Sequence, residues 1–141
     1  MRSISHVFVG LLCLMLVNCG EMGDKPLPGT WQMISGTYTT PSGQVIVDVD
    51  DRLCYKILGD DHFAVVEMYQ SKPDSLFFAA VGRYSLKDTV YTETLEGCNV
   101  PADVGRTNIF RSEIDGDRWR IYMKRQDMEL DETWKRIRKP Y

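Results

Sequence analysis

The chain has 141 residues, with 17 basic and 20 acidic side chains and a formal net charge of −3. This length predicts one globular domain, large enough to bury a core without needing disulfides or a metal. A weakly acidic chain without a basic stripe argues against nucleic acid as a partner.

The first 18 residues have the features of a bacterial lipoprotein export signal. Arg2 gives a positively charged start, and residues 7–17 form an apolar run. That run is shorter than the roughly 20 residues that a membrane-spanning helix needs, so we expect it to be cleaved. Cys19 follows in the sequence Leu-Val-Asn-Cys, where a lipid-attachment box would lie. We therefore predict lipidation of Cys19, with diacylglycerol and an acyl chain such as palmitate, because two or more chains hold a protein stably on a membrane.

Asn18 departs from the Gly, Ala or Ser that usually precedes a lipidated cysteine, so an ordinary secretory signal containing Cys13 and Cys19 is the alternative. Residues 19–26 are polar and contain glycine, as expected of a flexible tether, and residues 27–141 are the expected domain. We expect a lipid-anchored protein of the cell envelope, most simply in the outer membrane.

From residue 31 onward the chain predicts short β-strands separated by turn residues. Apolar and polar residues alternate with a period of two, and an Asp-Gly pair at residues 115–116 predicts a hairpin. We expect one helical turn near residues 101–104. The expected strands are residues 31–38, 44–48, 53–58, 62–69, 76–86, 89–95, 107–114, 118–124 and 129–137.

Eight or nine short sequential strands with tight turns predict an all-β fold, an antiparallel meander that closes into an up-and-down β-barrel. Closure removes the unpaired strand edges. A barrel of about eight strands either holds one small ligand or has a packed interior, and both remain open at this point.

Cysteine and histidine are too few for common catalytic and metal sites. After cleavage and lipidation of Cys19, Cys54 and Cys98 are the remaining free cysteines, and His62 is the one remaining histidine. The two cysteines are candidates for a disulfide in an oxidising compartment, provided that folding brings their Cα atoms within about 7 Å. A zinc site needs three or four close Cys or His ligands. Motifs for a nucleophile or a phosphate-binding loop are also missing from the sequence, so we expect no metal, no cofactor and no catalytic residues.

Both ends of the expected domain resemble lipocalins. Gly29-Thr30-Trp31 is similar to the Gly-x-Trp signature that opens those proteins, and Trp134 and Arg136 lie in the last expected strand. In lipocalins an arginine from the end of the barrel packs over that first tryptophan, and Arg136 is the matching position. A guanidinium over an indole gains about 0.5–2 kcal/mol.

More specifically, residues 27–138 resemble the lipocalin-like domains of uncharacterised lipoproteins from gut-type Gram-negative bacteria. Residues 56–63, 82–86, 91–93 and 132–137 carry this resemblance. It implies a lipocalin-like barrel and a binding role, with structural positions at Gly29, Trp31, Trp134 and Arg136. It offers no catalytic residues, and a fold alone does not determine function.

Glu93 is the most suggestive polar residue, because it shares one strand face with Tyr91 and Leu95. If this face points inward, Glu93 is a carboxylate in an apolar cavity, which is costly unless the group is paired or protonated. The alternatives are that the face points outward, or that Glu93 pairs with Arg83 or Arg111 on a neighbouring strand.

Two functions follow from these patterns. The first is a membrane-tethered lipocalin-like lipoprotein that binds a small apolar or amphipathic molecule in the barrel. The alternative is a structural or interaction module with a filled barrel that contacts another envelope protein. A cavity of a few hundred Å³ would favour binding. The candidate ligand-binding residues are Met33, Tyr91, Glu93, Trp119 and Tyr122, although aromatic residues at strand spacing are also typical of barrel packing.

Overall fold

The computed structural model describes residues 27–138 as an all-β domain. One short 3-10 turn, η1 (Pro101–Asp103), falls where a helical turn was expected. Among these residues no helix is long and apolar enough to cross a membrane. The strands are β1 (Gly29–Thr40), β2 (Gly43–Ile46), β3 (Arg52–Leu58), β4 (His62–Tyr69), β5 (Lys72–Lys87), β6 (Val90–Cys98), β7 (Thr107–Asp115), β8 (Arg118–Lys124) and β9 (Glu129–Ile137).

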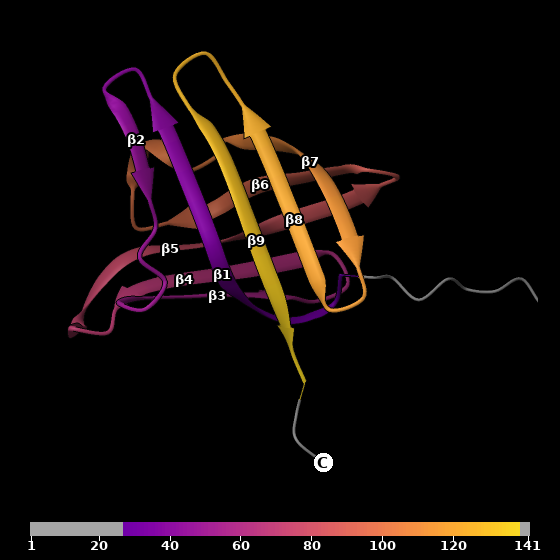
Figure 1. Ribbon diagram of the computed structural model, residues 1–141. Helices are drawn as coiled ribbons and strands as arrows, with labels where there is room; N and C mark the ends of the chain where they lie inside the picture. Colours follow the sequence, from indigo (N-terminus) through magenta and orange to yellow (C-terminus); the bar gives the residue numbers. More distant parts are fainter. Residues whose placement is uncertain (1–26, 139–141) are drawn as a thin grey trace, which may run out of the picture.

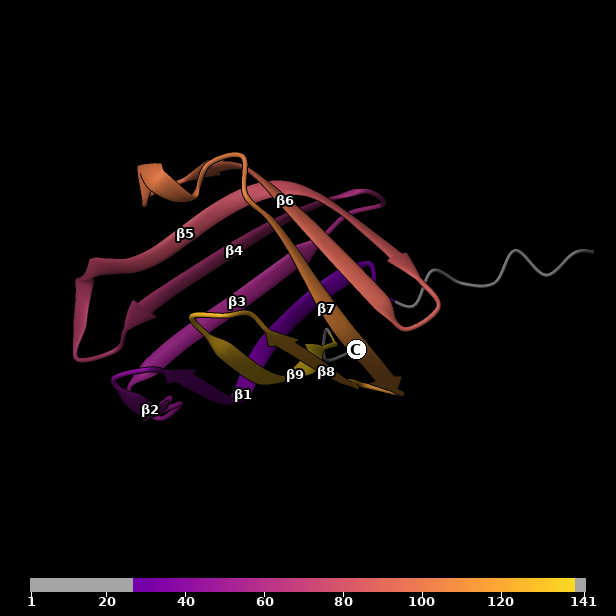
Figure 2. The same ribbon diagram turned by 90° about the horizontal axis from the view of Figure 1, so that it is seen from above.

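The strands form a closed antiparallel barrel, which confirms the predicted fold class. Each strand from β3 to β9 pairs with the next, and β1 closes the sheet by pairing with both β3 and β9. The barrel therefore has eight strands, while β2 pairs only with the last four residues of β1, Thr37 to Thr40. Figures 1 and 2 show β1, β9 and β8 crossing β3, β4 and β5 on the opposite wall.

Close approach of two strands shapes the wall at Gly82 in β5. A Cβ atom built there would lie 2.0 Å from the carbonyl oxygen of Thr94, and the pairing register of β5 with β6 shifts between Val81 and Gly82. Only glycine fits such a close backbone approach, which is one device by which a sheet bends into a barrel.

Aromatic rings fill one end of the barrel, which we call the base. The Trp119 ring lies 5.5 Å from Trp31, 4.9 Å from Tyr91 and 6.2 Å from Trp134, measured between ring centroids. All four side chains are almost completely buried. Rings at these separations pack in tilted or edge-on arrangements that add to the hydrophobic gain of burial.

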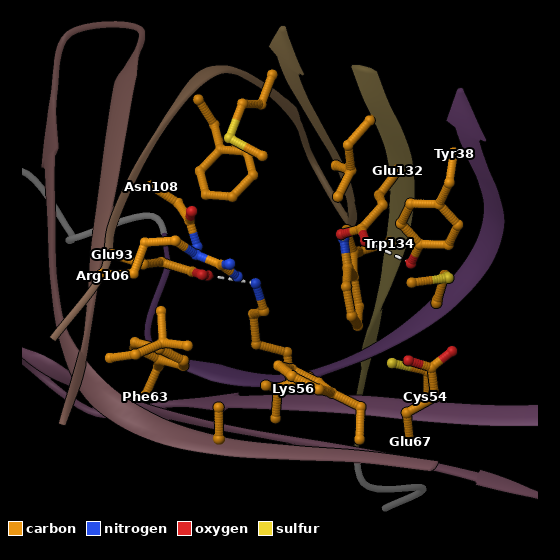
Figure 3. A pocket seen from close by; sticks show the side chains of 18 of the residues that line it. Tyr38, Cys54, Lys56, Phe63, Glu67, Glu93, Arg106, Asn108, Glu132 and Trp134 are labelled. Atoms are coloured by element: carbon orange, nitrogen blue, oxygen red, sulfur yellow. Dashed lines mark hydrogen bonds and ion pairs between the residues drawn. The ribbon is translucent and has the colours of Figure 1, made fainter. Parts of the chain in front are cut away.

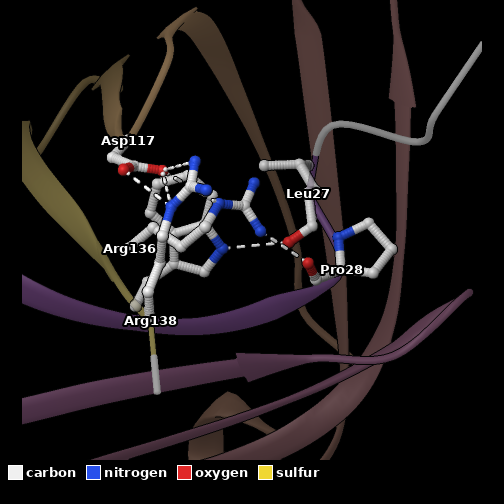
Figure 4. Close-up of polar contacts among 6 residues, drawn as sticks. Leu27, Pro28, Asp117, Arg136 and Arg138 are labelled. Atoms are coloured by element: carbon white, nitrogen blue, oxygen red, sulfur yellow. Dashed lines mark hydrogen bonds and ion pairs between the residues drawn. The ribbon is translucent and has the colours of Figure 1, made fainter. Parts of the chain in front are cut away.

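Arg136 closes the base from outside. Its guanidinium carbon lies 4.1 Å from the centroid of the Trp31 ring, and its Nη1 donates to the Pro28 carbonyl oxygen at 2.6 Å (Figure 4). Trp31 Nε1 in turn donates to the Leu27 carbonyl at 2.9 Å. This is the contact that the lipocalin resemblance implies. Gly29 is required beneath it, because φ is +137° and a Cβ would lie 2.8 Å from Arg136 Nη1.

Candidate ligand-binding site

A cavity of about 230 Å³ occupies the barrel above the base (Figure 3). It opens at the far end, where the lining residues Phe77 and Arg106 are partly exposed. Most of the lining is apolar: Met33, Cys54, Phe63, Val65, Phe77, Phe78, Ala80, Leu95, Phe110, Met123, Met128, Leu130 and Trp134. The polar lining residues are Tyr38, Lys56, Glu67, Glu93, Arg106, Asn108 and Glu132.

A buried ion pair crosses the floor of the cavity. Lys56 on β3 reaches Glu93 on β6, and Lys56 Nζ contacts Glu93 Oε1 directly. The Tyr91 hydroxyl donates to the same carboxylate oxygen at 2.8 Å. Both side chains of the pair are more than nine-tenths buried. A buried charge is tolerated when it is paired and hydrogen-bonded in this way.

Aromatic rings surround the Lys56 ammonium as well. Its Nζ lies between 5.1 and 6.0 Å from the centroids of five rings. These separations are within the range of cation–π attraction, which strengthens when the cation is removed from water. The rings and Glu93 together hold this ammonium in a fixed position. The five rings belong to Phe63, Tyr91, Phe110, Trp119 and Trp134.

Glu132 on β9 is a second buried carboxyl group, on the opposite wall. The Tyr38 hydroxyl donates to Oε1 at 2.9 Å and Trp134 Nε1 donates to Oε2 at 3.1 Å. Burial raises the pKa of Glu132 from 4.5 to about 7, with the neighbouring carboxylates Glu93 and Glu67 acting in the same direction. Lys56 and the Tyr38 hydrogen bond lower this pKa, but they do not offset the desolvation.

A third carboxyl group lies near the rim. Arg52 Nη1 lies 3.0 Å from Glu67 Oε1, and burial raises the pKa of Glu67 while Arg52 lowers it. Arg52 also stacks on Phe77, with its guanidinium carbon 4.2 Å from the ring centroid. On the other side of the mouth, Arg106 pairs with Asp103 at 2.5 Å. The rim cations therefore have acidic partners of their own.

The structure brings some of the predicted ligand-binding residues together and separates others. Met33 and Glu93 line the cavity. Tyr91 and Trp119 belong to the aromatic base and do not line the cavity. The Tyr91 hydroxyl donates to Glu93, and the Trp119 ring packs against two other tryptophans. Tyr122 does not line the cavity: on β8 it alternates with the buried Ile121 and Met123, so it lies on the outer face.

Sequence reasoning missed several residues of the cavity wall. Trp134 was expected to be structural and also lines the cavity. Lys56 and Glu132 were not predicted as site residues, although each has apolar neighbours two residues away along its strand. These neighbours are Cys54 and Leu58 for Lys56, and Leu130 and Trp134 for Glu132. A charged residue on the same strand face as apolar residues was the available signal for a buried charge. This signal was applied only to Glu93. Glu93 pairs with Lys56, not with Arg83 or Arg111.

Cys54 and Cys98 are both free thiols in the structure. Cys54 lies on β3 inside the barrel and Cys98 at the end of β6, with β4 and β5 between them in the sheet. Neighbouring strands are about 4.8 Å apart, so the disulfide that the sequence left open does not fit this topology. The signal at residues 1–18 and the whole tether at residues 19–26, including Cys19, lie outside the described residues.

Within residues 27–138 no group of three or more His, Cys, Asp or Glu side chains is arranged to hold a metal ion. The cavity has mainly apolar walls, a buried ion pair between Lys56 and Glu93, and the Glu132 carboxyl group, whose pKa is raised to about 7. Such a site can exclude water and recognise a polar group by hydrogen bonds or charge.

Two solved structures are similar to this chain. A lipocalin-like protein from Bacteroides uniformis ATCC 8492 has a TM-score of 0.52 and 17% identity, covering 79% of this chain and 99% of that one. An uncharacterized protein from Bacteroides eggerthii DSM 20697 has a TM-score of 0.49 and 19% identity, covering 78% of this chain and 98% of that one. At 17% identity the first likeness supports a lipocalin-like fold and nothing finer.

No curated protein matches the chain. A family model described as a domain of unknown function, DUF4488, matches residues 26–141. That range includes the whole barrel, from Gly29 at the base to Ile137 at the end of β9. The chain therefore belongs to the DUF4488 family.

Proposed function

We propose that the barrel binds one small amphipathic molecule in its cavity. The observation that carries this proposal is a space of about 230 Å³ with mainly apolar walls and a few buried polar groups. Ligand pockets are typically concave, mostly apolar and equipped with a small number of orienting polar groups. A barrel that served only as a rigid support would be expected to fill this space with side chains.

The size of the space limits the ligand. An apolar cavity of about 150 Å³ holds benzene, so about 230 Å³ corresponds to roughly nine non-hydrogen atoms. A longer ligand would extend through the mouth, past Phe77 and Met128. The buried polar groups favour a molecule with both an apolar body and a polar end.

The proposal includes a lipid tether at Cys19. Leu27, the first described residue, lies at the base, where its carbonyl accepts from Trp31. A tether leaving from there would join the barrel at the end opposite the mouth and leave the mouth accessible. Replacement Cys19→Ala should move the protein from the membrane fraction to the soluble periplasmic fraction, or leave it unprocessed. Equal labelling of both variants by a fatty-acid analogue would contradict the tether.

Native mass spectrometry of protein purified from its own host tests the binding proposal directly. A retained molecule should appear as a defined mass increment, and it should be lost from Ala80→Phe. Ala80 lines the cavity, so a phenyl group there would occupy it. The adjacent Ala79→Phe is the matched control, because Ala79 lies on the outer face in a shallow groove. Absence of a bound molecule, together with no saturable binding across a broad panel of metabolites and lipids, would contradict ligand binding.

A second candidate function is an interaction module, which one surface feature favours. Ile57, Val66 and Val81 on the outer faces of β3, β4 and β5 are exposed by 53%, 36% and 52%. Ala64 pairs with both Ile57 and Val81, so these side chains form a continuous apolar patch. Such patches are typical of contact surfaces. Val81→Lys should abolish co-purification of an envelope protein if this function is correct, while ligand binding in the cavity remains.

A further inference from the structure

The charges around the cavity do not balance one another. Three carboxyl groups from different strands line it: Glu67 on β4, Glu93 on β6 and Glu132 on β9. Glu67 has Arg52 at 3.0 Å, and Glu93 has Lys56 in direct contact. Among the described residues, no lysine, arginine or histidine lies within ion-pair distance of Glu132. Glu132 is therefore the carboxyl group in excess.

The nearby cations are already engaged. Lys56 is held by Glu93 and by five aromatic rings, so it is not available to approach Glu132. Arg106 at the mouth is paired with Asp103. Arg52 contacts Glu67 and also donates from Nη2 to the Tyr69 hydroxyl at 2.8 Å. The protein has a cation for each of the other two carboxylates and leaves Glu132 to a different partner.

The partners that Glu132 does have are neutral donors. The Tyr38 hydroxyl donates to one carboxylate oxygen, and Trp134 Nε1 donates to the other. These bonds orient the group and stabilise its ionised form but bring no positive charge to it. Lys56, held by Glu93, lowers the pKa of Glu132 only from a distance. The carboxyl group borders the cavity, and the Trp134 and Tyr38 rings border it beside Glu132 (Figure 3). A ligand cation placed there would meet a buried carboxylate and aromatic faces together.

We propose that the cavity selects ligands that carry a positively charged amine, and that Glu132 is the residue that recognises it. This inference rests on the proposed binding function and names its ligand class. An anionic ligand would have to displace Glu93 from Lys56 and would meet the charge of Glu132 and Glu67. A ligand cation beside Glu132 would offset part of the cost of burying this carboxylate without a counter-charge.

A matched set of three probe molecules tests whether the cavity prefers positively charged amines. 2-Phenylethylamine, 2-phenylethanol and phenylacetate share a phenyl ring and differ in charge, and each is close to the size that the cavity admits. Isothermal titration calorimetry on the folded domain at pH 8 should show that the amine binds at least tenfold more tightly than the alcohol. Phenylacetate should bind more weakly than both.

The substitution Glu132→Gln tests whether Glu132 recognises the amine. A glutamine can still accept from Trp134 and donate to the Tyr38 oxygen, so the fold should be kept while the charge is lost. Amine affinity should fall at least tenfold, and affinity for 2-phenylethanol should change less than threefold. Glu113→Gln is the control: Glu113 lies on the outer face of β7, half exposed and paired with Arg111. It should leave all three affinities unchanged.

Protonation gives a second, independent readout. Because the pKa of Glu132 is about 7, an ammonium ligand that needs the carboxylate should displace a proton when it binds at pH 6. Titrations in two buffers with different ionisation enthalpies measure that proton. Its release should disappear in Glu132→Gln. The other titratable or charged groups that interact with Glu132 are Tyr38 on β1, Cys54 and Lys56 on β3, Glu67 on β4, and Tyr91 and Glu93 on β6.

The outcomes separate this inference from the function on which it rests. Saturable binding of the alcohol with no preference for the amine would overturn the cationic ligand class and leave ligand binding intact. Amine preference that persists in Glu132→Gln would overturn the role of Glu132. No binding of any of the three probes would overturn the amine selectivity, and the mass spectrometry of host-purified protein would then decide whether the cavity binds another molecule.

Discussion

The two ends of this barrel are built from the same strands but differ in what they enclose. On β9, Trp134 packs into the base while Glu132, two residues earlier, borders the cavity. On β6, Tyr91 packs against Trp119 while Glu93 lines the cavity floor. The base is filled by large rings, and the upper half contains about 230 Å³ of space and three buried carboxyl groups.

This contrast shows how a small barrel supports a polar site. Burial of large aromatic side chains supplies stabilisation at the base. Buried ion pairs contribute little net stability, and an isolated buried carboxyl group costs stability. The base therefore stabilises a fold in which the cavity half can retain buried charged groups.

The largest expected effect comes from opening the base. Trp119→Ala removes a fully buried ring that contacts three others, so we expect a loss of about 4 kcal/mol in the free energy of unfolding. Urea denaturation, monitored by circular dichroism, measures this loss in the free energy of unfolding. The control is Tyr122→Ala on the outer face of the same strand, which should cost less than about 1 kcal/mol. Equal losses in both variants would contradict the contrast between base and wall.

The next effect concerns the ion pair of the cavity floor. Glu93→Leu leaves the Lys56 ammonium buried without its carboxylate, and we expect a loss of about 3 kcal/mol. The double variant Lys56→Met/Glu93→Leu should recover most of that stability, because it leaves no unpaired charge. Urea denaturation of the four proteins in the double-mutant cycle gives the coupling energy. A double variant as unstable as the sum of the two single variants would argue against a direct pair.

Glu132 should make stability depend on pH. Its pKa rises from 4.5 in the unfolded chain to about 7 in the barrel, so the folded protein holds this proton more tightly. The associated stability is fully present below pH 4.5 and is lost as pH rises through 7, by at most about 3 kcal/mol. Urea denaturation between pH 4 and 9 measures the slope.

Glu132→Gln should flatten the stability profile between pH 4.5 and 7. Some decline should remain, because burial raises the pKa of Glu67 in the same direction. Glu113→Gln, at an exposed site, should keep the full wild-type slope. An unchanged slope in Glu132→Gln would mean that Glu132 does not titrate abnormally.

The smallest effect is expected at the arginine that closes the base. Arg136→Met removes the cation–π contact with Trp31 and the hydrogen bond to Pro28, at a cost of about 1–2 kcal/mol. The exposed neighbour Lys135→Met is the control and should change stability by less than about 0.5 kcal/mol. Thermal unfolding measures the difference in stability between the two variants, and equal melting temperatures would contradict a closing role for Arg136.

Local patterns in the sequence predicted most of the barrel wall. Alternation placed Trp119, Ile121 and Met123 on one face, and the structure buries all three. The Asp-Gly pair predicted the hairpin between β7 and β8, which the structure contains. The same alternation placed Tyr122 opposite that buried face, and choosing Tyr122 as a ligand-binding residue went against the pattern.

The sequence by itself determined the order of the strands and most of their turns, because alternation and turn chemistry act between residues a few positions apart. The start of β5 was the exception: it was expected at residue 76 and lies at Lys72. Only the tertiary structure decided which polar residues meet. Lys56 and Glu93 are 37 positions apart, and Tyr38 and Glu132 are 94 apart. Their contacts exist because the sheet closes between β1 and β9 and turns their strands toward one interior. Closure also decided that this interior keeps a cavity, since the space left over depends on how all eight strands place their side chains at once.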